Sequence, residues 1–233
     1  MTVKKLIGVA SPAFLWENDN TNLDFYRFSN NYGKRVYACG GIPVGILPED
    51  GRIPDGVLER FDAFIICGGK KMWQHHFQVV EYAVKSGKPL LGICLGMQAI
   101  HRYFKYRDWI EQTGFEGDVY DFFAQNAHKP EFTTLVEVEG HCKTFPRENV
   151  DSCKHRVNLS PDSHIARIVG GDHLDAVTVH SYRVFEPSDK LTVTGYAEDG
   201  TVEVIEYGDN ILGVQFHPEA DDTLLPIFEF LMK

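Results

Sequence analysis

Short apolar runs alternate with amphipathic stretches along the first hundred residues. Residues 6–10, 42–47, 63–67 and 89–93 have the length and composition of buried strands. Residues 23–39, 55–60 and 72–86 have helical spacing, and another helix is predicted from Met97 to Phe104. Such alternation predicts a parallel sheet with helices on both faces.

The second half of the chain favours antiparallel strands. Residues 135–139 alternate as a half-exposed strand, and Asp199-Gly200 predicts a hairpin between residues 191–198 and 202–207. Further strands are predicted over residues 176–180 and 211–216, with a short helix after Ser163 and a final helix from Asp222. We therefore expect one α/β domain over residues 1–233, a three-layer sandwich with a mostly parallel central sheet and added antiparallel strands in its C-terminal half.

Residues 106–131 interrupt this rhythm with many aromatic and polar side chains. Two interpretations stay open: a lid or pocket wall, or a surface segment held down by its aromatic residues.

Cys94 lies at a predicted strand–turn–helix junction, flanked by Gly92 and Gly96. This is the logic of a nucleophile elbow, in which glycines permit a tight backbone and the helix N-terminus favours a thiolate. The alternative is a buried, inert thiol, because free cysteine is among the most buried residue types.

A second apolar run, residues 211–216, ends at His217-Pro218-Glu219. A histidine with a carboxylate two residues later suits a general base and the group that orients it, so His217 would activate Cys94 and Glu219 would hold His217. Taken singly, the histidine could be an ordinary surface residue and the glutamate a helix N-terminal acid.

These two segments resemble the class I glutamine amidotransferase-like family. Residues 92–98 match its G-x-C-x-G-x-Q signature, and residues 213–219 match its G-x-Q-x-H-P-E signature. Within that family the chain looks most like the γ-glutamyl-γ-aminobutyrate hydrolase (peptidase C26-type) branch. Residues 38–44, 155–159, 163–170 and 199–206 carry the branch resemblance.

The resemblance implies hydrolysis of a γ-glutamyl amide through a thioester on Cys94, without a metal or organic cofactor. It also implies an oxyanion hole from the backbone N–H groups of Gly69 and Leu95, although any Gly-Gly pair can make a plain turn. Gln98 would contact the glutamyl α-amino or α-carboxylate group, and Ser181 fits the branch's substrate-binding segment. The expected partner is a small γ-glutamyl substrate, and a homodimer is possible.

Two segments depart from the branch. It usually reads Asn-Ser-x-His-His-Gln where this chain has residues 180–185, which keep Ser181 but lose both histidines and the glutamine. The stretch from Gly69 to Cys94 is shorter than usual and lacks the expected Asp and Pro. Both regions border the family's pocket, so the leaving half of the substrate is open. Arg183 or Lys70-Lys71 could bind an acidic substrate, but a charged side chain is by default expected to be exposed to solvent without a binding role.

Other functions compete with this hydrolase. A glutaminase could hand ammonia to a separate synthetase subunit, or the altered pocket could bind γ-glutamyl compounds without turnover. The related chaperone or peptidase type tends to place a histidine directly after the cysteine, where this chain has Leu95.

Composition excludes several classes of partner. A net charge of −10 and a pI of about 5.4 leave no electrostatic footprint for nucleic acid or an anionic membrane. No run of about 18 apolar residues predicts a membrane span, and the N-terminus does not read as a signal peptide.

The cysteines and histidines suggest neither a disulfide framework nor a metal site. Five cysteines without regular spacing argue against disulfides and fit a reducing cytoplasm. The adjacent pair His75-His76 would point to different helix faces. A possible zinc-ligand set remains, but its spacing matches no usual zinc motif: His141, Cys142, Cys153 and His155.

Overall fold

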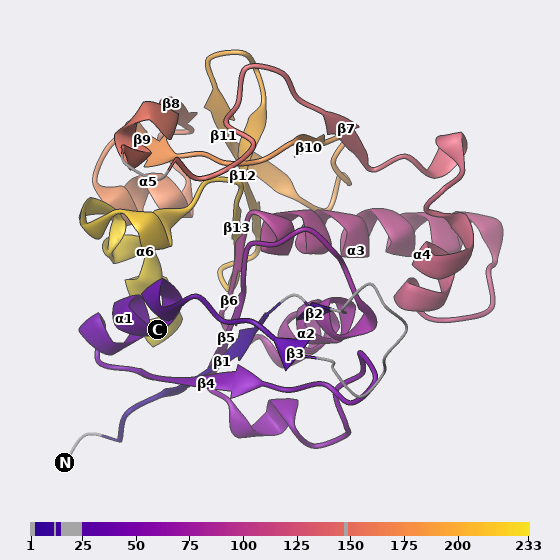
Figure 1. Ribbon diagram of the computed structural model, residues 1–233. Coiled ribbons are helices and arrows are strands. Elements are labelled where there is room, and N and C mark those ends of the chain that lie inside the picture. The colour runs from indigo at the N-terminus through magenta and orange to yellow at the C-terminus, as the bar shows by residue number, and fades with distance from the viewer. Residues whose placement is uncertain (1–2, 12, 15–24, 147–148) are drawn as a thin grey trace.

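The computed structural model describes residues 3–11, 13–14, 25–146 and 149–233. A nine-stranded sheet runs through the molecule, with helices packed on both of its faces (Figure 1). Its first five strands are parallel neighbours, and the remaining four pair antiparallel. In spatial order they are β4 (Ile42–Ile46), β1 (Leu6–Ala10), β5 (Ala63–Ile66), β6 (Leu90–Ile93), β13 (Ile211–Val214), β12 (Val202–Tyr207), β11 (Thr192–Ala197), β8 (Lys154–Leu159) and β9 (His173–Val177).

The central parallel strands are buried from end to end because both faces of the sheet are covered. Along β5, Phe64 and Ile66 pack into one core with α2 and α3, whereas Ala63 and Ile65 pack into a second core with α1, α5 and α6. The expected three-layer α/β architecture is therefore confirmed. The helices are α1 (Asn30–Ala38), α2 (Gln74–Ser86), α3 (Leu95–Thr113), α4 (Val119–Asn126), α5 (His164–Val169) and α6 (Pro226–Glu229).

The first helix is shorter than predicted. α1 begins at Asn30, where the Ser29 side chain caps it by accepting from the Asn31 N–H. Phe25–Tyr26 instead forms β3, a two-residue strand that pairs with β2 (Ala13–Phe14). Residues 23–24, also assigned to that helix, lie outside the described residues.

The aromatic segment after residue 105 is helical and packed. α3 continues to Thr113 and ends at Gly114, whose φ of +67° suits glycine; α4 follows. The Phe122 ring packs against Tyr106 and Trp109. This contact lies about 20 Å along α3 from Cys94 at 1.5 Å per residue. The segment is therefore pinned by its aromatic residues, and α4 packs at the end of α3 away from Cys94 (Figure 1).

Other boundaries shift slightly. The strand predicted at residues 135–139 is β7 (Leu135–Glu137), which pairs with β10 (Tyr182–Val184) in a separate small sheet. The predicted final helix is broken into α6 and short 3-10 turns around it. Among the described residues, none of the helices combines the length and apolarity needed to cross a bilayer.

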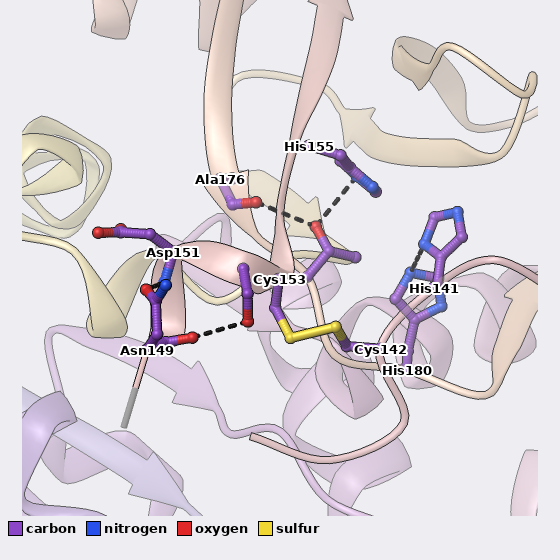
Figure 2. Close-up of a disulfide and its surroundings, with 10 residues drawn as sticks. His141, Cys142, Asn149, Asp151, Cys153, His155, Ala176 and His180 are labelled. Carbon is purple, nitrogen blue, oxygen red and sulfur yellow. Dashed lines mark hydrogen bonds between the residues drawn. A yellow bond between two sulfur atoms is a disulfide. The ribbon is translucent and has the colours of Figure 1, made fainter. Parts of the chain in front are cut away.

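The expectation of no disulfide is wrong for one pair. Cys142 and Cys153 are joined by a disulfide, with their Cα atoms 5.7 Å apart (Figure 2). A bridge between Cys142 and Val179 brings the loop after β7 beside the segment that follows β9. Sequence spacing could not show this proximity because it arises from tertiary packing.

Candidate active site

Cys94 occupies a strained turn between β6 and α3. Its φ of 51° and ψ of −102° are unusual for a residue with a side chain, and its N–H donates to the Val214 carbonyl at 2.8 Å. The neighbouring glycines make this turn possible. A Cβ on Gly96 would lie 2.3 Å from the Ile66 carbonyl oxygen, and one on Gly92 would meet the Gly96 backbone at 2.6 Å. The predicted elbow is therefore present, with the thiol at the N-terminus of a 19-residue helix.

His217 lies beside this turn because β13 pairs with β6 in parallel register, Val214 opposite Ile93. Its N–H donates to the Val177 carbonyl at 2.8 Å, and its Nδ1 lies 2.8 Å from Glu219 Oε1. Glu219 sits in the 3-10 turn Pro218–Ala220 and is as buried as His217. The sequence-predicted histidine and carboxylate are thus paired.

Gly68 shows how closely Cys94 and His217 approach. A Cβ placed on Gly68 would lie 2.7 Å from His217 Cε1 and 3.4 Å from Cys94 Cβ, so both side chains border one spot. Cys94 is also one of the groups that raise the pKa of His217, as expected for two side chains this close. Residues 123 positions apart in the chain therefore meet at the carboxyl ends of adjacent strands, where ligands bind in open α/β sheets.

The buried imidazole is held in its charged form. Burial alone would lower the pKa of His217, but Glu219 and then Cys94 outweigh it and hold this pKa well above its ordinary value. A protonated imidazole beside a sulfur favours the thiolate, which is the nucleophilic form. The arrangement therefore places a proton donor directly beside the sulfur.

Tyr32, on α1, is a site residue that sequence reasoning missed. Its hydroxyl accepts the Gly68 N–H at 3.0 Å, and burial, followed by the charge of Glu219, raises its pKa well above the ordinary value. The Tyr32 hydroxyl therefore stays protonated next to the group formed by Cys94, His217 and Glu219, which we call the triad. In the sequence Tyr32 fits the apolar face of a helix, so no signal separates it from a core aromatic.

The backbone donors expected for an oxyanion hole border the same spot. Gly69 follows Gly68 at the carboxyl end of β5, and Leu95 is the first residue of α3. Among the described residues, neither the Gly69 N–H nor the Leu95 N–H donates to a side chain or to a carbonyl of a loop or turn. Tyr32 occupies the Gly68 N–H, so Gly69 is the better candidate donor of the diglycine.

Gln98 holds the segment 179–182 next to α3. Gln98, one turn along α3, is buried, and its side-chain amide nitrogen donates to the Tyr182 carbonyl and to Gln215 Oε1, each at 3.2 Å. The Cys94 thiol donates to the Val179 carbonyl at 3.9 Å. Ser181 lies between these two contacted carbonyls, so the segment 179–182 runs alongside the thiol. The structure gives Gln98 a hold on that segment, which sequence reasoning did not foresee.

Phe145 covers the imidazole. Its ring meets His217 edge-on at a centroid distance of 4.9 Å, and Phe145 itself is 48% exposed. Cys94 itself is only 6% exposed.

Replacing Glu219 tests the origin of the raised His217 pKa. In Glu219→Gln, burial still lowers the pKa of His217 but the strongest opposing charge is gone, so the imidazolium loses its proton at lower pH than in the wild type. A step that needs this proton then fails earlier as pH rises. We expect the alkaline limb of kcat/KM to move to lower pH, measured as a pH–rate profile. The exposed Glu198→Gln variant should keep the wild-type limb; an unmoved limb in Glu219→Gln would remove this glutamate from the mechanism.

Comparison with known proteins places this geometry in a family. Residues 22–233 match the family model for glutamine amidotransferase class-I. A glutamine amidotransferase-like protein of Rickettsia prowazekii (strain Madrid E), RP404, is 27% identical, with 100% of this chain and 98% of that protein covered. The imidazole glycerol phosphate synthase subunit HisH of Zymomonas mobilis is 33% identical over 177 residues, 72% of this chain and 70% of its own.

A solved structure shares the fold. A glutamine amidotransferase from Thermotoga maritima superimposes with a TM-score of 0.60 at 15% identity, covering 93% of this chain and 77% of its own. The chain belongs to the class I glutamine amidotransferase family.

Proposed function

We propose that the protein hydrolyses the γ-glutamyl amide bond of a small γ-glutamyl compound through a thioester on Cys94. The observation that carries the proposal is the strained Cys94 at the elbow, beside an imidazole whose Nδ1 lies 2.8 Å from Glu219 Oε1. A nucleophile, a base and an orienting carboxylate in this order form the general constellation of acyl transfer.

The reaction follows from the charge states of these groups. The Cys94 thiolate attacks the γ-carbonyl carbon, and the negative oxygen that forms accepts from the N–H groups of Gly69 and Leu95. The C–N bond then breaks as His217 gives its proton to the leaving amine, which leaves a thioester. Neutral His217 next takes a proton from water. The hydroxide adds to the thioester, the C–S bond breaks, and glutamate leaves. Glu219 fixes the imidazole orientation throughout.

The wall at residues 179–182 is the proposed glutamyl-binding side. Gln98 ties this wall to α3 through the Tyr182 carbonyl, and Ser181 stands between the two residues whose carbonyls contact Cys94 and Gln98. We propose that the α-amino and α-carboxylate groups of the substrate bind along this wall. The branch itself, a homodimer and a cytoplasmic location remain predictions; a cysteine nucleophile does require a compartment in which Cys94 stays reduced.

A second candidate is a glutaminase that supplies ammonia to a synthase. The likeness to HisH, a subunit of imidazole glycerol phosphate synthase, favours it. In that case the chain alone would release little glutamate, and a partner would raise the rate.

Released glutamate from a substrate panel separates the two functions. The purified chain is incubated with free glutamine, a set of γ-glutamyl amines and folyl polyglutamates, and glutamate is measured enzymatically. The proposal predicts turnover of at least one γ-glutamyl amine at a kcat/KM well above that for glutamine. Turnover of glutamine alone would favour the ammonia-supplying subunit. Ligand binding without turnover of any of these compounds would contradict the proposed hydrolysis.

A further inference from the structure

Three imidazoles and one carboxylate converge outside the triad. His141 follows β7, His155 lies on β8, His180 precedes β10 and Glu203 lies on β12. Glu203 Oε1 is 3.4 Å from the Nε2 atoms of both His155 and His180 and 4.0 Å from His141 Nδ1. Figure 2 shows the three histidines grouped beside the Cys142–Cys153 disulfide.

His141 and His180 each have one ring nitrogen next to a hydrogen-bond acceptor outside the cluster, which fixes the proton on that nitrogen. His141 Nε2 lies 3.2 Å from Asp199 Oδ2, and His180 Nδ1 lies 2.9 Å from the Tyr182 carbonyl, which can only accept. In the neutral tautomers that make these bonds, the inner nitrogens carry lone pairs. Those two nitrogens face each other at 2.9 Å (Figure 2). Only a cation, either an extra proton or a metal ion, makes this approach favourable.

Glu203 gives the second, independent observation. It is completely buried, and neither carboxylate oxygen receives a hydrogen bond of normal geometry from the described residues. The nearest polar atoms to Glu203 Oε1 are the imidazole nitrogens of His155 and His180, each at 3.4 Å. A buried carboxylate without a full set of donors needs a counter-charge.

The spacing of the donor atoms suits a small ion. Zinc–ligand bonds of about 2.0–2.1 Å in a tetrahedron place ligand atoms about 3.3 Å apart. The two 3.4 Å separations from Glu203 Oε1 have this length. Thr178 Oγ1 donates to the Ala176 carbonyl and lies 3.0 Å from His155 Nε2, so in the metal-free protein it accepts the proton of that nitrogen (Figure 2). Metal binding through Nε2 therefore requires the His155 proton to move to Nδ1.

The surroundings have the form of a supporting shell. Asp199 and the Tyr182 carbonyl orient two of the imidazoles, as such partners do in metal sites. The disulfide ties the loop carrying His141 to the start of β8, which carries His155. His155 is the partly exposed member, with 27% of its side chain accessible, and offers the entry path.

We propose that His141, His155, His180 and Glu203 form a binding site for one divalent transition-metal ion of zinc-like preference. Imidazole with a single carboxylate suits such ions better than Mg²⁺ or Ca²⁺, which prefer oxygen ligands. The zinc set considered from sequence included two of these histidines, but its cysteines are held in the disulfide. The proposal is independent of the proposed hydrolysis.

Metal titration of the full chain tests the site. Protein stripped with a chelator is titrated with Zn²⁺ against a chromophoric competitor, and bound metal is counted by mass spectrometry; Co²⁺ absorption reports the geometry. We expect one ion per chain and a tetrahedral Co²⁺ spectrum. Asp199→Asn should raise the Kd about 10-fold. His155→Gln and Glu203→Gln should each raise it further. The exposed His173→Gln is the matched control and should leave the Kd unchanged.

A second variant keeps the test valid if the first does not fold. If circular dichroism shows that Glu203→Gln is unfolded, His155→Gln replaces it, because His155 is the partly exposed member of the cluster. Cys142→Ser/Cys153→Ser should keep the ion. Loss of the ion in that variant, together with an unchanged Kd in His155→Gln and Glu203→Gln, would mean that thiolates hold it and would overturn the assignment. Failure to bind one ion per chain, or a Kd unchanged by both cluster variants, would overturn it equally.

Discussion

Replacing Cys94 with alanine is expected to lower kcat by about 10⁴-fold or more while the protein stays folded. The thiol is the only group in the proposed reaction that forms a covalent bond to the substrate, so neither His217 nor the oxyanion donors can replace it. Alanine keeps the Cβ and the backbone of the elbow, and the thiol contributes only a long contact to the Val179 carbonyl. Steady-state glutamate release and thermal unfolding measure the two effects separately.

Cys39→Ala is the matched control for this loss. Cys39 is also a free cysteine, at the C-terminal cap of α1, and burial raises its pKa, so it is a poor nucleophile. Its removal should leave kcat within about two-fold of the wild type. Substantial turnover in Cys94→Ala, or an equal loss in Cys39→Ala, would defeat the assignment of the nucleophile.

Gly96→Ala is expected to cost about 3 kcal/mol or more in the free energy of unfolding and to remove most activity. The new Cβ would lie 2.3 Å from the Ile66 carbonyl oxygen and 3.0 Å from the Ile66 Cβ, both on a central strand buried on two faces. To make room, α3 must move away from β5, and Cys94 moves with its first turn. Urea unfolding and kcat measured on the folded fraction test the two consequences.

Gly33→Ala is the contrasting helical glycine. Gly33 lies inside α1, where the nearest heavy atom to a new Cβ is Pro43 Cγ at 3.7 Å. Alanine there should stabilise the protein by about 0.5–1 kcal/mol, because glycine is the poorer helix former. Equal stability of Gly96→Ala and wild type would show that the elbow is not tightly packed against β5.

The parallel half of the fold was readable from sequence because its strands are short apolar runs separated by stretches with helical spacing. The Gly92–Gly96 frame around Cys94 was readable for a similar local reason, since only small residues fit that turn. The pairing of His217 with Glu219 followed from their separation of two residues.

What sequence could not show depends on tertiary packing. No sequence pattern indicates that Cys142 and Cys153 form a disulfide. Nor does any pattern indicate that His180 contacts His141, 39 positions earlier. Residues 106–131 could not be assigned because their helical spacing is hard to recognise among many polar residues. The aromatic side chains of α4 pack against α2 and α3, a contact that the sequence does not show. Tyr32 looked like a core aromatic because only its hydroxyl reaches the site.

The most direct measurement is the covalent state of Cys94 during turnover. A reaction of the purified chain with its best γ-glutamyl amide is quenched in acid within one turnover, digested and analysed by mass spectrometry. The account predicts one γ-glutamyl group on the peptide that carries Cys94, formed and lost at rates compatible with kcat. Turnover without that adduct under such quenching, or an adduct confined to Cys39 or Cys67, would contradict it.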